Sequence, residues 1–185
     1  MTTRSSLEHL NTCAPEFFCA VLSDVWEHAP WVAEGVVGQR PFATVEALHA
    51  AMVRLVAGQD EGTRVAFYAG HPELAGEDAR RGTMTDASIA EQGTLSLAHL
   101  DTHEAEHWNA LNQAYRARFG FQFILCIRRH TRESALQAFT QRLAHDRATE
   151  LAITLAEISA ITRLRLDRLV SDVSPLASHG ESTPF

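Results

Sequence analysis

A histidine, a hydroxyl, a carboxylate and a primary amide stand close together in the middle of this sequence. His71 precedes Pro72, which fixes the direction of the chain at the start of a turn. Ser88, Glu91 and Gln92 follow at spacing i, i+3, i+4, so a helix carries these three side chains on one face. Groups of these types can bind a substrate rich in hydrogen-bonding groups and move a proton. The spacing therefore predicts a small polar catalytic site.

The alternatives to a catalytic site are capping roles. A histidine beside a helix start is often a capping or surface residue, and Ser88-x-x-Glu91 fits a capping box that begins a helix. Thr85 and Asp86 are equally good caps one turn earlier. If one of them begins the helix, Ser88 and Glu91 share a stripe with Leu95. Both interpretations remain open from the sequence.

Arg165 interrupts the apolar face of a long predicted helix. At about 100° per residue, Arg165 shares that face with five other residues: Leu151, Leu155, Ile158, Thr162 and Leu169. Arg163 and Asp167 point away from it. An unpaired buried charge costs several kcal/mol, so Arg165 needs a partner. That partner is either a carboxylate of the protein, in a salt bridge, or an anionic group of a substrate.

A histidine-rich helix offers a second kind of site. His99, His103 and His107 are four residues apart, and two histidines one turn apart can bind zinc or nickel. Three such positions drift by about 40° per step around a helix, and no second metal-ligating segment is evident. Asp101-x-x-Glu104 fits a helix cap. We therefore expect a solvated helix face and no metal.

Composition and charge exclude several function classes. The 185 residues carry a net charge of −7 and no basic stripe, which argues against a nucleic-acid partner. No apolar run approaches the roughly 20 residues of a membrane span, so no membrane partner is expected. Cys13, Cys19 and Cys126 are an odd number without metal-type spacing, which favours a reduced compartment and a cytoplasmic location. Cys126 lies in an apolar run and is predicted to be a core residue.

Helical periodicity dominates the chain and predicts an all-α fold. We expect a single compact domain of about six to eight helices over residues 1–173 and a mobile tail at 174–185. One helix is expected between Pro15 and Pro30 and another between Thr44 and Gly58. The other predicted helices span 63–69, 86–98, 102–118, 132–144 and 148–170. Residues 76–85 should form a polar loop, and the aromatic run 121–127 should be a buried extended connection.

Five motifs in register carry a family resemblance. They are His71-Pro72-Glu73-Leu74-Ala75, Ser88-x-x-Glu91-Gln92, Phe119-Gly120-Phe121-x-Phe123-Ile124, His130-Thr131-Arg132-Glu133-Ser134 and Glu157-Ile158-x-x-Ile161-x-x-Leu164-Arg165-Leu166. Two earlier segments fit the same family: Glu27-His28-Ala29-Pro30-Trp31-Val32-Ala33 and Arg40-Pro41-Phe42. Over about residues 7–172 the sequence resembles 2-oxo-4-hydroxy-4-carboxy-5-ureidoimidazoline (OHCU) decarboxylase.

The resemblance implies an all-α homodimer without a cofactor that decarboxylates OHCU to (S)-allantoin, the last step from urate in purine breakdown. It implies that His71 is the catalytic histidine. Our hypothesis makes His71 the acid/base and Glu91 a second catalytic group, which orients His71 or holds ureido N–H groups. The substrate-binding positions implied are Pro72, Ser88, Gln92, Phe121, Phe123, Ile124 and Arg165.

Two positions depart from the family pattern. Gly93-Thr94-Leu95 stands where the family typically has Ala-Gly-Leu, and Gln122 stands where a proline is common. Both positions affect packing near the site rather than a reacting group, so the predicted chemistry is unchanged.

Other functions fit part of the sequence. Within enzymes, the chain could act on another ureido or imidazolone acid. From a different class, it could be a helical binding or metal-sensor module that uses His99, His103 and His107, which metal content would distinguish. We also expect any coupling to the hydrolase that supplies OHCU to occur in trans, because one domain fills the chain.

Overall fold

The computed structural model describes residues 4–76, 86–95, 97 and 100–172. The predicted fold class, all-α, is confirmed: the described residues form nine α-helices, three short 3-10 helices and two strands of two residues each. The number of helices exceeds the predicted six to eight because two helices are only six residues long. The expected tail at 174–185 lies outside the described residues. The chain divides into two compact units, which are described in turn.

The first unit contains residues up to Gly58 and from Thr162 onward. Its helices are α1 (Leu7–Thr12), α2 (Pro15–Leu22), α3 (Trp31–Val36), the 3-10 helix Val37–Gln39 and α4 (Val45–Ala57), joined by the C-terminal part of α10 (Arg147–Leu169). As predicted, α2 starts at Pro15, and Thr44 caps α4 by accepting the Ala47 N–H at 3.0 Å.

The segment around Pro30 differs from the prediction. The helix that was expected to reach Pro30 stops at Leu22. A new helix, which was not predicted, begins at Trp31. Pro30 is the N-cap of α3 with helical backbone angles, φ −59° and ψ −25°. Proline is well tolerated at a helix start because no intrahelical partner is available there for a backbone N–H.

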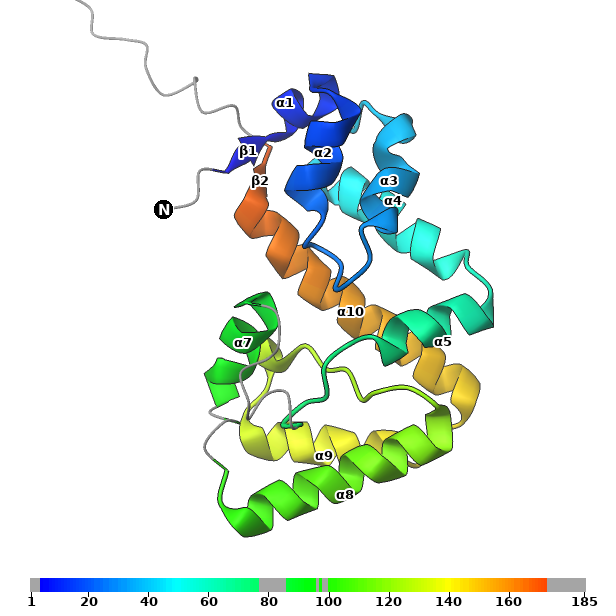
Figure 1. Cartoon of the computed structure of the whole chain (residues 1–185), viewed down its shortest axis with the longest axis vertical. Helices are drawn as coiled ribbons and strands as arrows, with labels where there is room; N and C mark the ends of the chain where they lie inside the picture. Colours follow the sequence, from blue (N-terminus) through cyan, green and yellow to red (C-terminus); the bar gives the residue numbers. More distant parts are fainter. Residues whose placement is uncertain (1–3, 77–85, 96, 98–99, 173–185) are drawn as a thin grey trace, which may run out of the picture. The chain divides into compact units, whose positions relative to one another are not determined.

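A short strand pair was not predicted. β1 (Ser5–Ser6) pairs in parallel with β2 (Val170–Ser171), next to α10 in Figure 1. Two residues per strand are too few to produce an alternating hydrophobic pattern, so the sequence carries no signal for them.

The second unit, Gln59–Ile161, contains the predicted catalytic stretch. Its elements are α5 (Glu61–Ala69), α7 (Asp86–Gln92), the 3-10 helix Gly93–Leu95, α8 (Thr102–Phe119), the 3-10 helix Ile127–Arg129, α9 (Arg132–Arg142) and the N-terminal part of α10. α5 begins two residues earlier than predicted, because Asp60 caps it. Residues 77–85 of the predicted polar loop lie outside the described residues.

The connection from α8 to α9 is extended, as predicted. Figure 1 shows it running back along α8 from Gly120, which ends that helix with φ +78°. Its side chains are mostly buried, and the Phe123 ring stacks on the Phe139 ring of α9 with centroids 3.8 Å apart. We name residues Phe121–Cys126 the wall segment.

Among the described helices, none is long and apolar enough to cross a membrane.

Candidate active site

His71 lies two residues after the last residue of α5. Its Nδ1 is 3.1 Å from the Phe67 carbonyl oxygen, and its ring packs edge-on against the Phe67 ring with centroids 4.8 Å apart. A carbonyl oxygen only accepts hydrogen bonds, so Nδ1 carries the proton. Nε2 is then the basic nitrogen of the neutral imidazole. The helix end thus fixes both the orientation and the tautomer of a half-buried histidine.

The turn after His71 is tied to α8. Glu73 forms an ion pair with Arg116, and the Leu74 carbonyl accepts a hydrogen bond from Asn112 Nδ2 at 3.0 Å. Asn112 is buried. A Cβ at Gly76 would lie 2.6 Å from the Glu73 Cβ, so the turn closes on itself too tightly for any other residue there. Asn112 was missed at the sequence level because a buried amide on a helix has no distinctive spacing.

The buried face of α7 is polar. Ser88 and Glu91 are buried, whereas Ile89 is 40% exposed and Ala90 is also exposed. α7 begins at Asp86, so Ser88 is its third residue and the capping-box interpretation is wrong. An ordinary surface helix buries its apolar face, and α7 does the reverse. Buried polar groups are retained at a cost, which favours a functional role for this face.

Gln92 is the last residue of α7, and its side chain lies outside the described part of the structure. The helix predicted over 86–98 is shorter in the structure, because α7 ends at Gln92. Gly93, one of the positions that depart from the family pattern, begins a 3-10 helix, and glycine has a low helix propensity. Gln122, the other departure, is half-buried at the start of the wall segment.

Cys126 is buried, as predicted, at the far end of the wall segment. Burial raises the pKa of its thiol; the Arg129 guanidinium lowers it, and the Glu157 and Glu91 carboxylates raise it further. The thiol is therefore protonated at neutral pH and is a poor nucleophile.

The wall residues Phe121, Phe123 and Ile124 are all at most 5% exposed. Tyr68, one turn before His71, packs edge-on against Phe121 with ring centroids 5.4 Å apart. α5, which leads to His71, is thereby in contact with the wall segment.

Arg165 forms a buried ion pair in the first unit. Its Nη1 lies 2.7 Å from Oε2 of Glu27, and the two side chains are 8% and 2% exposed. The structure thus bears out the salt-bridge alternative for Nη1 of Arg165. Arg163 and Asp167 form a separate i, i+4 ion pair at 2.9 Å, away from this face as predicted. Glu27 belongs to a recognised motif, but its role could not be inferred, because its partner is 138 positions away.

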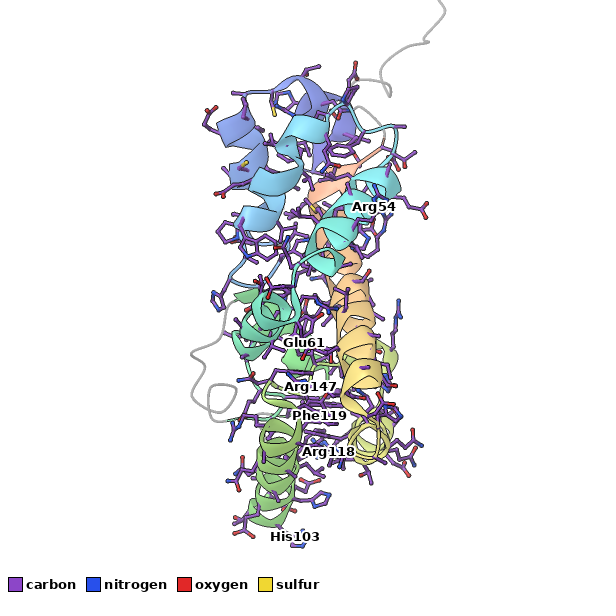
Figure 2. The ribbon with its side chains drawn as sticks, turned by 90° about the vertical axis from the view of Figure 1, so that its right-hand side faces the viewer. Arg54, Glu61, His103, Arg118, Phe119 and Arg147 are labelled. Carbon is purple, nitrogen blue, oxygen red and sulfur yellow. The ribbon has the colours of Figure 1, made fainter. Side chains whose placement is uncertain are left out.

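The two described histidines of the histidine-rich helix, His103 and His107, belong to no metal-site cluster. His103 and His107 are exposed on α8, and Figure 2 shows His103 at the end of that helix. His99 lies outside the described residues. Within the ranges that the structure describes, no group of three histidine, cysteine or acidic residues could hold a metal ion. Asp101 and Glu104 form the expected capping box.

Comparison with known proteins identifies relatives over most of the chain. The family model described as OHCU decarboxylase matches residues 11–167. The 2-oxo-4-hydroxy-4-carboxy-5-ureidoimidazoline decarboxylase of Haloferax volcanii is 35% identical over 161 residues, which cover 87% of this chain and 94% of that protein. The uric acid degradation bifunctional protein PucL of Bacillus subtilis is 33% identical over 167 residues, 90% of this chain but only 33% of that protein.

Solved structures agree with these relatives. An (S)-allantoin synthase superposes with a TM-score of 0.68 at 25% identity, covering 89% of this chain and about half, 54%, of that chain. An OHCU decarboxylase in the presence of (S)-allantoin shares the fold, with a TM-score of 0.59 at 19% identity over 84% of this chain and 97% of that chain. The five motifs and the all-α fold agree with the family match over residues 11–167. The chain therefore belongs to the OHCU decarboxylase family.

Proposed function

We propose that this protein decarboxylates OHCU to (S)-allantoin, with His71 as the acid/base. The observation that carries the proposal is the buried polar face of α7, Ser88 and Glu91, in a chain that belongs to the OHCU decarboxylase family. A structural helix has no need of two buried polar groups with a solvent-exposed isoleucine opposite them.

The substrate carries its own electron sink. Its carboxylate lies next to a ring C=N bond, which accepts the electron pair when the bond to CO2 breaks, while the ring nitrogen takes up a proton. The ring hydroxyl then loses its proton to become a carbonyl, and the neighbouring carbon gains one proton. The protein must orient the carboxylate, stabilise the developing charge and deliver that proton to one face.

His71 is suited to the proton transfers. With Nδ1–H donated to the Phe67 carbonyl, Nε2 can accept the proton of the ring hydroxyl and return it to carbon. The rigid turn that follows, held by Asn112 and Arg116, limits where the ring can lie. This restriction favours protonation of a single face.

The remaining candidates have binding roles in this proposal. Glu91 orients His71 or holds ureido N–H groups, and Ser88 and Gln92 satisfy the amide edges of the substrate. Arg165 neutralises an anionic oxygen. Contacts to the substrate ring come from Pro72, Phe121, Phe123 and Ile124.

The assembly and location extend the same proposal. The protein acts as a homodimer in the cytoplasm, in trans with the hydrolase that supplies OHCU. The uric acid degradation bifunctional protein of Bacillus subtilis, of which this chain matches a third, supports coupling to a second step of uric acid degradation.

The test is circular dichroism of the allantoin formed when the protein is added to freshly generated OHCU, with and without EDTA. Because OHCU decays spontaneously, both the rate and the handedness must be followed. Fast appearance of the S enantiomer, unchanged by EDTA, is expected. Racemic product at the spontaneous rate would exclude OHCU as the substrate, and other ureido acids would be tried next. Loss of activity in EDTA would instead favour the histidine-helix alternative.

Arg165 requires a design that separates binding from folding. Arg165→Met alone removes the guanidinium that pairs with the buried Glu27 carboxylate, which costs about 3–5 kcal/mol. The double variant Glu27→Gln, Arg165→Met removes both charges and should fold. We expect its KM to rise about tenfold or more with little loss of kcat, since a hydrogen bond to a charged group contributes roughly 1.5–3 kcal/mol.

The matched control is Glu27→Gln, which keeps the guanidinium. Steady-state kinetics of the three proteins are to be compared with their melting temperatures. If the double variant folds and keeps the wild-type KM, Arg165 has only the structural role of the ion pair.

A further inference from the structure

The backbone of the wall segment has two edges. In an extended chain, the N–H and C=O groups of one residue point to the same edge, and those of its neighbours point to the opposite edge. The groups of residues 122 and 124 and the Cys126 N–H therefore share one edge, and residues 121, 123 and 125 share the other. The Cys126 carbonyl leaves this pattern, because the chain turns there, with φ −75° and ψ 78°, into the 3-10 helix Ile127–Arg129. Among the residues that the structure describes, the segment belongs to no sheet, and no strand lies along either edge.

Charged side chains hold the first edge at two points. Arg142 Nη1 of α9 donates to the Ile124 carbonyl at 2.7 Å, and Glu157 Oε2 of α10 accepts the Cys126 N–H at 2.7 Å. A bond between an ionised group and the backbone is shorter and about twice as strong as a neutral one. The two contacts hold groups that are two residues apart and therefore lie on the same edge of the segment.

A third contact fixes where the segment begins. Arg147 donates to the Phe119 carbonyl at the end of α8, and its Nε lies 2.8 Å from Glu61 Oε1 of α5. Figure 2 shows Glu61, Arg147 and Phe119 stacked one above another. Since α5 leads directly to His71, the end of α8, which the wall segment follows, is tied to the helix just before the proposed acid/base.

Arg142 is itself held rigidly. It is 5% exposed, its guanidinium carbon lies 4.6 Å from the Phe123 ring centroid, and its Nη2 is 2.9 Å from Glu150 Oε2. Thr154 accepts a further hydrogen bond at 3.1 Å. Because these contacts fix the Arg142 guanidinium, its hydrogen bond in turn fixes the position of the Ile124 carbonyl.

The second edge faces the other way. Phe123 and Leu125 are 1% and 7% exposed, and within the described residues no hydrogen bond is made by their N–H groups. Buried backbone groups are almost always paired, so donors left without a protein partner are suited to a ligand or an ordered water.

We propose that Arg142 and Glu157 are positioning residues of the active site: by holding the Ile124 carbonyl and the Cys126 N–H, they direct the opposite backbone edge, at Phe123 and Leu125, to the substrate. This inference rests on the proposed function and adds to it two residues that touch no substrate. The N–H groups of the free edge would bind the carbonyl or carboxylate oxygens of a ureido acid, and its carbonyls would bind ureido N–H groups.

Glu157 offers the sharper test, because it is half-buried and its removal leaves no buried charge unpaired. The variants are Glu157→Ala and Glu157→Asp, which cannot reach the Cys126 N–H, and Glu157→Gln, which keeps an acceptor at the same reach. Glu106→Ala removes an exposed carboxylate of α8 and serves as the matched control. KM and kcat for OHCU are measured for each, together with the dissociation constant of (S)-allantoin by calorimetry.

We expect Glu157→Ala and Glu157→Asp to raise KM and weaken (S)-allantoin binding about tenfold, with kcat within about threefold of wild type. Glu157→Gln and the control should stay close to wild type. If the Ala variant does not fold, the Asp variant carries the test.

A lower melting temperature with unchanged KM and unchanged (S)-allantoin binding would overturn the positioning role and leave the proposed function intact. If the wild-type protein fails to form (S)-allantoin from OHCU, the proposed function falls, and this inference falls with it.

Discussion

Replacing His71 by alanine should lower kcat by about 10² or more, since general acid–base catalysis contributes roughly 10²–10⁴. The substitution removes the imidazole and its contacts with the Phe67 carbonyl and ring, but it leaves the turn anchored by Asn112 and Arg116. We therefore expect a folded protein with a KM close to wild type. The rate is measured by circular dichroism of allantoin, after subtraction of the spontaneous decay of OHCU.

The control for this prediction is His107→Ala, which removes an exposed imidazole from α8 and should leave kcat unchanged. His71→Gln is a useful companion, because an amide can keep the contact with the Phe67 carbonyl while losing the basic nitrogen. It should be as slow as the alanine variant. Turnover near wild type in either His71 variant would remove this residue from the mechanism and transfer the acid/base role to Glu91.

Local signals explain what could be predicted of the fold. Thr44, Asp101 and Thr131 cap helices within one or two residues of their predicted starts, because capping depends on a side chain and a backbone N–H three positions away. The extended wall segment was also predicted, from its aromatic and branched residues and its lack of a partner. The predicted helix end at Pro30 was wrong: a helix begins there, because proline suits both a break and a first turn.

In the candidate site, too, only the features that depend on local spacing could be predicted. The shared face of Ser88 and Glu91 follows from helical spacing alone, and the structure selects the stripe over the capping box. The ion pair of Arg165 was foreseen as one of two alternatives, but Glu27 as its partner was not. Arg142 gave no signal at all. Its partners, the Ile124 carbonyl and Glu150, are brought close only by packing, which short-range spacing does not show.

The buried network around Arg142 has a consequence for stability as well as for the wall segment. The Glu150 carboxylate is fully buried and accepts from Arg142 Nε at 3.0 Å, while Nδ1 of His145 lies 2.7 Å from it. Tyr115 also donates to this carboxylate. Burial raises the pKa of the Tyr115 phenol well above its usual range, with the Arg142 charge opposing this, so the phenol remains a donor. Glu150 is thus a buried anion whose only guanidinium partner is Arg142 among the described residues.

Arg142→Met should therefore lower the free energy of unfolding by about 3–5 kcal/mol, the cost of leaving one member of a buried ion pair uncompensated. The Ile124 carbonyl also loses its donor. The double variant Arg142→Met, Glu150→Gln removes both charges and should recover most of the loss. As a surface comparison, Arg163→Met breaks the partly exposed pair with Asp167 and should cost at most about 1 kcal/mol. Urea unfolding of the four proteins measures these differences.

Recovery of stability without recovery of substrate affinity is the informative combination. The double variant restores electrostatic balance, but it leaves no guanidinium to hold the Ile124 carbonyl. If Arg142 serves the fold alone, stability and KM should return together. If Arg142 also positions the wall segment, stability returns while KM stays raised, because neither methionine nor glutamine provides the rigid fork that reaches Ile124 and Glu150 at once.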